Sequence, residues 1–452
     1  MVLAAALMAQ ALAAAAANDC ATLTGRELAG GSRVVSAERI AVTGTAAVCR
    51  TVLESSAGRG SRIETELWLP LTGWSGRFVQ LGTGGFAGTI PTEGLAAEVR
   101  RGNAVAVTDA GHRGRDGFDA AWARGHPEAV LDYGFRAVPI AAAAAKAATA
   151  AFYGAAPRHS YFVGCSNGGR QALMAAQRNP ETWDGVLAGS PALRWSEQLS
   201  RFGEIQRALR GAPAAMIPRD KLPAIQAAAR SGALRADRLG LNRAQAQAVR
   251  LILRDFDARW AAAPGGWDQW IVNPDRNAPS QLTFAEQFFG AMVDDRPDWR
   301  VEDLTERDLE HARRLAPVLD ATNPDLSAFR RRGGKLIIYA GAADPVISPK
   351  TVIGYFESLP VRDNVRLFVI PGMLHCQGGP EPNAFGQAPV APALAEDPDH
   401  DVRRALEAWV EHGRAPEHLV TAKYTRDDPR QGVAATQVVR AYRAGGPEGE
   451  RR

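Results

Sequence analysis

The feature that most constrains this chain is a short apolar run that leads through a glycine-rich turn into a helical pattern. Residues 161–163 predict a buried strand, and residues 170–177 predict a helix that stops near Pro180. Between them lies the pattern G-x-S-x-G at residues 164–168, whose glycines tolerate a sharp turn and let a helix pack close to a strand. The sequence therefore predicts that Ser166 stands above a sheet, at the positive end of the next helix. A structural turn with an inert serine is the alternative.

Composition narrows the class of protein. The 452 residues suffice for one large domain plus an insertion or a second small domain. The formal net charge is only +4 and the basic residues are scattered, so the sequence gives no electrostatic footprint for nucleic acid.

The first 17 residues are rich in alanine and leucine and end in small residues. This pattern predicts a signal peptide at 1–17, and an alanine-rich helix of the mature fold is the alternative. No other stretch is apolar over the ~20 residues of a membrane helix. We therefore expect a secreted or periplasmic protein with no membrane partner.

Short apolar runs alternate with helical patterns along most of the chain. The predicted strands lie at residues 62–70, 77–81, 103–108, 161–163, 335–339 and 365–370. Such alternation predicts an α/β fold built on a mostly parallel sheet with helices on both faces. From about residue 193 the pattern is helical and broken by prolines and glycines, so we expect a lid over the cleft. The predicted domains are a catalytic domain at 18–192 and 327–452 and a lid domain at 193–326.

Two further residues follow predicted strands in the manner of Ser166. Asp344 comes after the strand at 335–339, and His375 comes after the strand at 365–370. Because the C-terminal ends of parallel strands lie along one edge of a sheet, these side chains are expected to converge. His375 would then take the proton of Ser166, and Asp344 would fix the histidine tautomer and stabilise the imidazolium. His112, in the loop after residue 108, is the weaker candidate for the base.

A glycine-rich loop at residues 82–88 follows the strand at 77–81. It lacks the Lys-Ser/Thr ending of a P-loop and the spacing of a dinucleotide fingerprint. Its other use is an oxyanion hole, with one backbone N–H from Gly84 or Gly85 and one from Asn167. A purely structural turn is the alternative.

The four cysteines are even in number, in a chain that we expect to be exported. Three pairings are possible; Cys20 with Cys49 is the local choice, which leaves Cys165 with Cys376. The second bond would join the neighbour of Ser166 to the neighbour of His375, and closing so long a loop stabilises by roughly 5 kcal/mol. Two unrelated buried thiols are the alternative.

These residues resemble the tannase and feruloyl esterase family of serine hydrolases, which includes the mono(hydroxyethyl) terephthalate hydrolases. The Cys-Ser, Asp and His-Cys signature of that family is present as Cys165-Ser166, Asp344 and His375-Cys376. Further similar segments are 74–78, 84–88, 108–112, 168–171, 183–185, 408–413 and 415–416. The resemblance implies an α/β-hydrolase fold with a lid inserted before the acid strand, a disulfide between Cys165 and Cys376, and ester substrates with an aromatic acid.

The family lid usually carries a calcium loop rich in aspartate and glycine. Here residues 231–240 contain Asp237 as their single carboxylate, which cannot supply the several oxygen ligands of calcium. We expect no metal and no other cofactor. Aromatic residues that are candidates to face an acyl ring, with core packing as the alternative, are Phe86, Trp267, Trp270, Phe288 and Phe289.

The predicted function is that of a serine carboxylesterase acting through an acyl-enzyme on small esters of aromatic acids, of the feruloyl, galloyl or terephthalate monoester type. An esterase or lactonase for aliphatic substrates is the alternative within enzymes. A non-catalytic ligand-binding protein that kept the fold is the alternative from another class.

Overall fold

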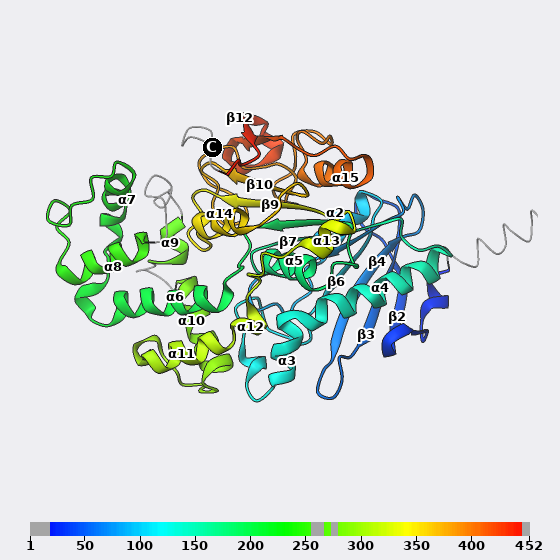
Figure 1. The fold of residues 1–452 in the computed structure, drawn as a ribbon, viewed down its shortest axis with the longest axis horizontal. Helices are drawn as coiled ribbons and strands as arrows, with labels where there is room; N and C mark the ends of the chain where they lie inside the picture. Colours follow the sequence, from blue (N-terminus) through cyan, green and yellow to red (C-terminus); the bar gives the residue numbers. More distant parts are fainter. Residues whose placement is uncertain (1–18, 255–265, 273–278, 445–452) are drawn as a thin grey trace, which may run out of the picture.

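A ten-stranded mixed sheet organises the chain. The computed structural model describes residues 19–254, 266–272 and 279–444 (Figure 1), so the predicted signal peptide at 1–17 lies outside the described residues. The strands follow the order β1-β2-β3-β4-β6-β5-β7-β8-β9-β10. Their bounds are β1 (Glu27–Leu28), β2 (Ser32–Ile40), β3 (Val48–Ser55), β4 (Ile63–Pro70), β5 (Arg77–Leu81), β6 (Ala104–Thr108), β7 (His159–Cys165), β8 (Gly185–Gly189), β9 (Lys335–Gly341) and β10 (Val365–Ile370).

The strands from β6 to β10 in this order are parallel, whereas β1 to β4 pair antiparallel and β4 joins β6 antiparallel. The parallel strands are short apolar runs because both of their faces are covered; every residue of β6 and of β8 is buried. This arrangement confirms the expected α/β fold. A separate two-stranded antiparallel sheet follows helix α15 (Val402–His412) along the chain; its strands are β11 (His418–Tyr424) and β12 (Val433–Arg440).

Helices cover both faces of the sheet (Figure 1). On one face lie α4 (Ala137–Tyr153), α5 (Asn167–Arg178) and α14 (Pro349–Ser358), and on the other lie α2 (Thr92–Arg100) and α15 (Val402–His412). The short helix α3 (Pro127–Leu131) and a π-helical turn at Asp132–Arg136 lead into α4. Six of the nine buried residues of α4 are alanine, which lets the helix lie close to the strands.

One helical run among the described residues, Pro127–Tyr153, is long and apolar enough to cross a membrane by length and composition. Half of its most apolar window is buried within the protein, and α4 packs on β3, β4 and β6. The run is therefore placed as a core helix of the sheet.

The chain between β8 and β9, here called the helical insert, contains no strand in the parts that the structure describes. In Figure 1 the insert, largely green, extends to the left of the sheet. Its helices are α6 (Trp195–Arg210), α7 (Leu222–Arg230), α8 (Arg243–Leu253), α9 (Gly266–Trp270), α10 (Ser280–Gln287), α11 (Glu306–Arg314), α12 (Ala316–Leu319) and α13 (Ser327–Arg331). The predicted lid, 193–326, lies within this insert; its action as a lid and the domain boundaries stay predictions.

Candidate active site

Ser166 occupies the turn between β7 and α5. Its backbone angles, φ 63° and ψ −123°, are unusual for a residue with a side chain and cost about 1–3 kcal/mol. Three hydrogen bonds hold this conformation: the Ser166 N–H donates to the Gly189 carbonyl at 2.9 Å, and the Ser166 carbonyl accepts from the N–H groups of Arg170 at 3.0 Å and Ala192 at 3.1 Å. The turn therefore projects Ser166 out of the sheet, as the G-x-S-x-G pattern predicts.

The glycines of this turn are required by close backbone approach. A Cβ on Gly164 would lie 2.4 Å from the carbonyl oxygen of Gly168, and a Cβ on Gly168 would lie 3.1 Å from the backbone of Gly82. The next residue, Gly169, would place a Cβ 2.3 Å from the carbonyl oxygen of Gly189. Helix α5 thus lies directly against three neighbouring strand ends, which leaves its first turn no room to shift.

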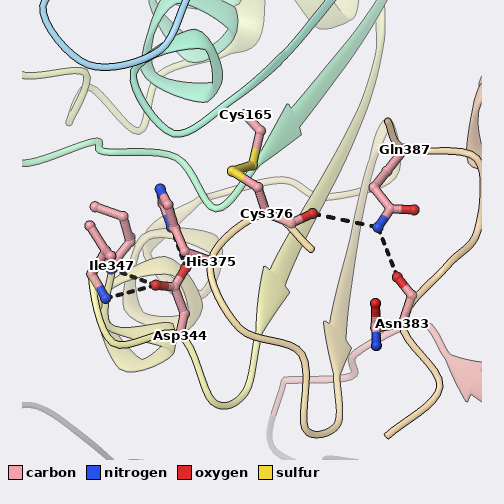
Figure 2. The surroundings of a disulfide bond; sticks show 8 residues. Cys165, Asp344, Ile347, His375, Cys376, Asn383 and Gln387 are labelled. Carbon is pink, nitrogen blue, oxygen red and sulfur yellow. Dashed lines mark hydrogen bonds and ion pairs between the residues drawn. A yellow bond between two sulfur atoms is a disulfide. The ribbon is translucent and has the colours of Figure 1, made fainter. Parts of the chain in front are cut away.

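Asp344 and His375 form a hydrogen-bonded pair at the same sheet edge (Figure 2). The Asp344 Oδ2 atom accepts a hydrogen bond from His375 Nδ1 at 2.8 Å, and Oδ1 accepts from the backbone N–H groups of Val346 at 2.8 Å and Ile347 at 3.0 Å. Because an ionised carboxylate only accepts, Nδ1 carries the proton and Nε2 keeps a lone pair. The Asp344 side chain is 1% exposed, so both groups are held away from bulk water.

A disulfide joins the loop of Ser166 to the loop of His375. Cys165 and Cys376 are bonded with their Cα atoms 6.0 Å apart, and Cys20 and Cys49 form the second bond with Cα atoms 5.4 Å apart. Both predicted pairings are confirmed. Because Ser166 and His375 are the direct neighbours of the bonded cysteines, the bond limits their separation.

Gln387, which the sequence did not indicate, supports the histidine loop (Figure 2). Its Nε2 donates to the carbonyl oxygens of Cys376 at 3.5 Å and Asn383 at 2.8 Å. Cys376 has a positive φ of 65°, a conformation that a side chain disfavours. The disulfide and Gln387 therefore hold a turn that the backbone would not adopt by preference.

The loop at residues 82–88 presents two backbone donors. Among the described residues, the N–H groups of Gly84 and Gly85 have no hydrogen-bond acceptor, and the same holds for the N–H of Asn167. By contrast, the Phe86 N–H donates to the Gly117 carbonyl at 2.8 Å, and the Ala87 N–H donates to the Gly84 carbonyl at 2.9 Å. The donors named by the sequence are thus those that the fold leaves available; their role as an oxyanion hole stays a prediction.

His112 does not join the pair of Asp344 and His375. Its Nε2 donates to the Phe86 carbonyl at 2.8 Å, and its ring stacks on Trp122 at a centroid distance of 3.5 Å. Burial lowers the pKa of His112 to about 4, so the ring is neutral at physiological pH. His112 therefore supports the glycine-rich loop through its hydrogen bond to the Phe86 carbonyl.

One aromatic side chain of the insert reaches the histidine. The Trp270 ring lies 5.5 Å from the His375 ring, at 78° to it. Behind it, Phe284 lies 6.5 Å from Trp270 and 5.3 Å from Phe86 of the glycine-rich loop. Phe284 was not among the residues suggested by the sequence, because a helical pattern does not tell which face of α10 meets the sheet.

The other suggested aromatics occupy interior positions. Trp267 is buried in an apolar cluster between α6, α7 and α8. Phe288 and Phe289 are fully buried, pack on each other at 5.1 Å, and Phe289 stacks on Trp299 at 4.8 Å. Nothing in the described part of the structure supports a substrate contact for these three residues; they are placed as core residues.

In the described residues, no group of three or more His, Cys, Asp and Glu side chains is arranged to hold a metal ion. In the segment where the family lid carries its calcium loop, Asp237 is exposed and pairs with Arg235 at 3.4 Å. One carboxylate with this partner does not fit a calcium site. The expectation that the protein needs no metal stays a prediction.

Known proteins are similar to this chain over most of its length. A family model described as "Tannase and feruloyl esterase" matches residues 47–238 and 255–444. An uncharacterized esterase of Xanthomonas campestris pv. campestris is 38% identical, over 88% of this chain and 81% of its own. A probable feruloyl esterase B-2 of Aspergillus flavus is 30% identical, over 86% of this chain and 82% of its own.

Two solved structures share the fold. Feruloyl esterase B from Aspergillus oryzae superposes with a TM-score of 0.81 at 23% identity, over 94% of this chain and 95% of its own. Tannin acyl hydrolase from Aspergillus niger superposes with a TM-score of 0.66 at 20% identity, over 91% of this chain and 87% of its own. With the strand order and the serine turn, they establish the α/β-hydrolase fold. The chain therefore belongs to the tannase and feruloyl esterase family of carboxylic ester hydrolases.

Proposed function

We propose that this protein is a serine carboxylesterase that hydrolyses esters of aromatic acids through an acyl-enzyme. The observation that carries the proposal is the hydrogen bond from His375 Nδ1 to Asp344, which leaves Nε2 as a base next to a disulfide-linked serine turn. An aligned base and acid beside a strained serine turn are the requirements of nucleophilic catalysis.

In the first half of the reaction, the Ser166 Oγ attacks the ester carbonyl carbon while its proton passes to His375 Nε2. Asp344 stabilises the resulting imidazolium. The carbonyl oxygen becomes an oxyanion, which accepts hydrogen bonds from the N–H groups of Asn167 and of Gly84 or Gly85. The C–O bond to the alcohol then breaks, and the alcohol leaves with the proton from His375.

In the second half, a water molecule gives a proton to His375 Nε2 and attacks the acyl-enzyme carbonyl. A second tetrahedral intermediate forms in the same oxyanion hole. Collapse of this intermediate breaks the bond to Ser166, returns the proton to Oγ and releases the carboxylic acid. No step requires a metal or a cofactor.

The acyl group is proposed to be aromatic. Trp270 meets the His375 ring edge-on, and Phe284 and the fully buried Phe86 pack behind it, so one planar apolar ring lies next to the base. Aromatic side chains favour stacked or edge-on contact with a planar acyl group. The names of the relatives, feruloyl esterase and tannin acyl hydrolase, support feruloyl esters first and galloyl esters second, with terephthalate monoesters as a third candidate.

We further propose that the protein works outside the cytoplasm, in the periplasm or the extracellular medium. Its four cysteines are all paired in two disulfides, and such bonds persist in oxidising compartments. The proposed partner is a small ester substrate.

The test is hydrolysis of a panel of feruloyl, galloyl, terephthaloyl and short alkanoyl esters by the protein and by Ser166→Ala. Removal of the nucleophile is expected to lower kcat by roughly 10⁴- to 10⁶-fold on aromatic esters. Ser231→Ala, an exposed serine of the insert, is the matched control and keeps full activity. Turnover of only alkanoyl esters would replace the aromatic assignment by an aliphatic one, and turnover unaffected by Ser166→Ala would refute the mechanism.

A further inference from the structure

Buried side chains hold the backbone of the glycine-rich loop at residues 82–88. Three of its carbonyl oxygens each accept a hydrogen bond from a different side chain: Thr83 from Asn167 Nδ2 at 2.8 Å, Gly85 from the Tyr133 hydroxyl at 3.0 Å, and Phe86 from His112 Nε2 at 2.8 Å. The loop therefore has little freedom to turn its peptide groups.

The bond to Thr83 has a direct consequence for the proposed oxyanion hole. A peptide group is planar and trans, so a carbonyl and the N–H that follows it point in opposite directions. When Asn167 Nδ2 holds the Thr83 carbonyl, it also sets the direction of the Gly84 N–H. The backbone N–H of Asn167 is the other proposed donor. One residue thus supplies one donor and aims the second.

The Asn167 side chain is itself fixed. Its Oδ1 accepts from Arg170 Nε at 2.7 Å and from the Tyr133 hydroxyl at 3.1 Å, so its amide nitrogen must face Thr83. Arg170 is 0% exposed and also donates to the carbonyl of Gly134 at 2.9 Å. A buried guanidinium that gives its hydrogens to carbonyl oxygens leaves the amide a single orientation.

The Tyr133 hydroxyl joins both sides of the hole. It has one hydrogen, shared between the Gly85 carbonyl on the loop and Asn167 Oδ1 on the serine turn, and it accepts from Trp195 Nε1 at 2.8 Å. Burial raises the pKa of Tyr133 to about 12, so the hydroxyl keeps its hydrogen at working pH. Tyr133 lies in the π-helical turn Asp132–Arg136, a rare geometry that recurs at functional sites.

Trp195 begins α6, the first helix of the insert, and Arg170 Nη1 donates to the carbonyl of Leu319, in the last part of α12. One of these segments is therefore bonded to Tyr133 and the other to Arg170, and both of these residues donate to Asn167 Oδ1. The placement of the insert and the geometry of the donors are coupled through Tyr133 and Arg170.

We infer that Tyr133 and the Asn167 side chain are positioning residues of the oxyanion hole, which aim the N–H groups of Gly84 and Asn167 at the developing negative oxygen. The inference rests on the proposed function, because it assumes a tetrahedral intermediate on Ser166. It adds residues that act through the hole to those that carry out the chemistry.

The first test compares Tyr133→Phe with Tyr355→Phe. Both substitutions remove one buried hydroxyl. The Tyr133 hydroxyl has three protein partners, and the Tyr355 hydroxyl has two, Gln177 at 2.9 Å and the Asn323 carbonyl at 3.1 Å. Tyr133→Phe is expected to lower kcat for a feruloyl ester roughly 10- to 100-fold and to change KM less than about twofold. Tyr355→Phe is expected to keep kcat within about twofold at a similar loss of melting temperature.

A tetrahedral mimic separates positioning from general damage. The inhibition constant of an aromatic boronic acid, which forms a tetrahedral adduct on a reactive serine, is expected to rise in Tyr133→Phe by the same factor as kcat falls. Binding of an aromatic ligand without a carbonyl or carboxylate group is expected to stay unchanged, because such a ligand places no oxygen in the oxyanion hole. If Tyr133→Phe does not fold, Asn167→Ala provides the same comparison, since it removes the donor to Thr83.

Several outcomes would overturn the inference. Unchanged kcat in Tyr133→Phe and Asn167→Ala would do so, and so would equal losses in Tyr133→Phe and Tyr355→Phe. A loss of kcat with no loss of boronic acid affinity would also exclude positioning. Failure of the proposed function has a different signature, because Ser166→Ala would then remain active.

Discussion

The catalytic edge of the sheet and the helical insert are held in place by different kinds of contact. At the sheet edge the constraints are in the backbone: glycines at which an added Cβ would lie within 2.4 Å of a neighbouring carbonyl oxygen, residues with positive φ at Ser166 and Cys376, and a disulfide between two loops. In the insert the constraints are side chains, such as the cluster around Trp267 and the stack of Phe289 on Trp299. All four cysteines of the chain lie outside the insert.

The two kinds of contact differ in how much substitution they tolerate. The backbone around Gly164 and Gly169 leaves no room for an added Cβ, so the fold nearly fixes the geometry of the proposed nucleophile, base and acid. Apolar side chains can be exchanged for others of similar volume at modest cost. We therefore expect substrate preference to be adjusted in the insert, which brings Trp270 to His375.

The largest expected effect comes from the sheet edge. Asp344→Asn replaces an oxygen that accepts from His375 Nδ1 with an amide that also presents N–H, so the histidine adopts the wrong tautomer. We expect kcat to fall about 10⁴-fold with a nearly unchanged melting temperature. The steady-state rate of hydrolysis of a feruloyl ester measures this loss of kcat.

The matched control is Asp363→Asn, an exposed carboxylate paired with Arg330 at 2.7 Å. It should leave kcat within about twofold, since this ion pair is exposed to water, which screens its charges. A loss below tenfold in Asp344→Asn would contradict the role assigned to the pair.

An effect of intermediate size is expected at Gly164 of the sheet edge, and Gly203 of the insert serves as its comparison. A Cβ on Gly164 would meet the Gly168 carbonyl oxygen at 2.4 Å, whereas a Cβ on Gly203 in α6 would meet only the side chains of Phe289 at 3.1 Å and Leu304 at 3.2 Å. Gly164→Ala is therefore expected to lower the free energy of unfolding by about 3 kcal/mol.

Gly203→Ala is expected to change the free energy of unfolding by less than about 1 kcal/mol, because the gain in helix propensity offsets the strain. Urea unfolding followed by circular dichroism provides both values. Equal losses at the two positions would remove the distinction between backbone and side-chain constraint.

The smallest expected effect concerns the insert. Trp270→Ala removes the ring that lies edge-on to His375, so kcat/KM for a feruloyl ester is expected to fall about tenfold. For a short alkanoyl ester it should change less than about twofold, since such an acyl group has no ring to contact. Equal losses on both esters would show that Trp270 supports His375 instead of the substrate.

Much of the sheet was predictable because short apolar runs between turns leave few alternatives. The strands at 77–81 and 365–370 match β5 and β10, and the two cysteine pairings were correct. Strand β2, which lies between β1 and β3, was missed, because the adjacent exposed residues Glu38 and Arg39 break the alternation of its side chains. β8 was missed because glycine and alanine give a weak strand signal.

The site residues, like the strands, include some that the sequence predicted and some that it did not. Residue type and position after a strand were enough to predict that Asp344 and His375 lie together, because parallel strands end at one edge of the sheet. Tyr133 and Phe284 were not identified, since their partners lie far away in sequence, on elements whose relative placement no local pattern encodes. For the same reason Trp267, Phe288 and Phe289, which were suggested as substrate contacts, are found in interior packing.

The Cys165–Cys376 bond has a topological consequence. It closes a covalent ring across a sequence separation of 211 residues, and the whole insert lies on that ring. A protease that cuts one peptide bond within the insert would leave the fragments as one molecule, with Ser166 on one fragment still tethered to His375 on the other. The nick would be visible by electrophoresis only after reduction, because the disulfide would keep the proposed nucleophile and the proposed base in one covalent molecule.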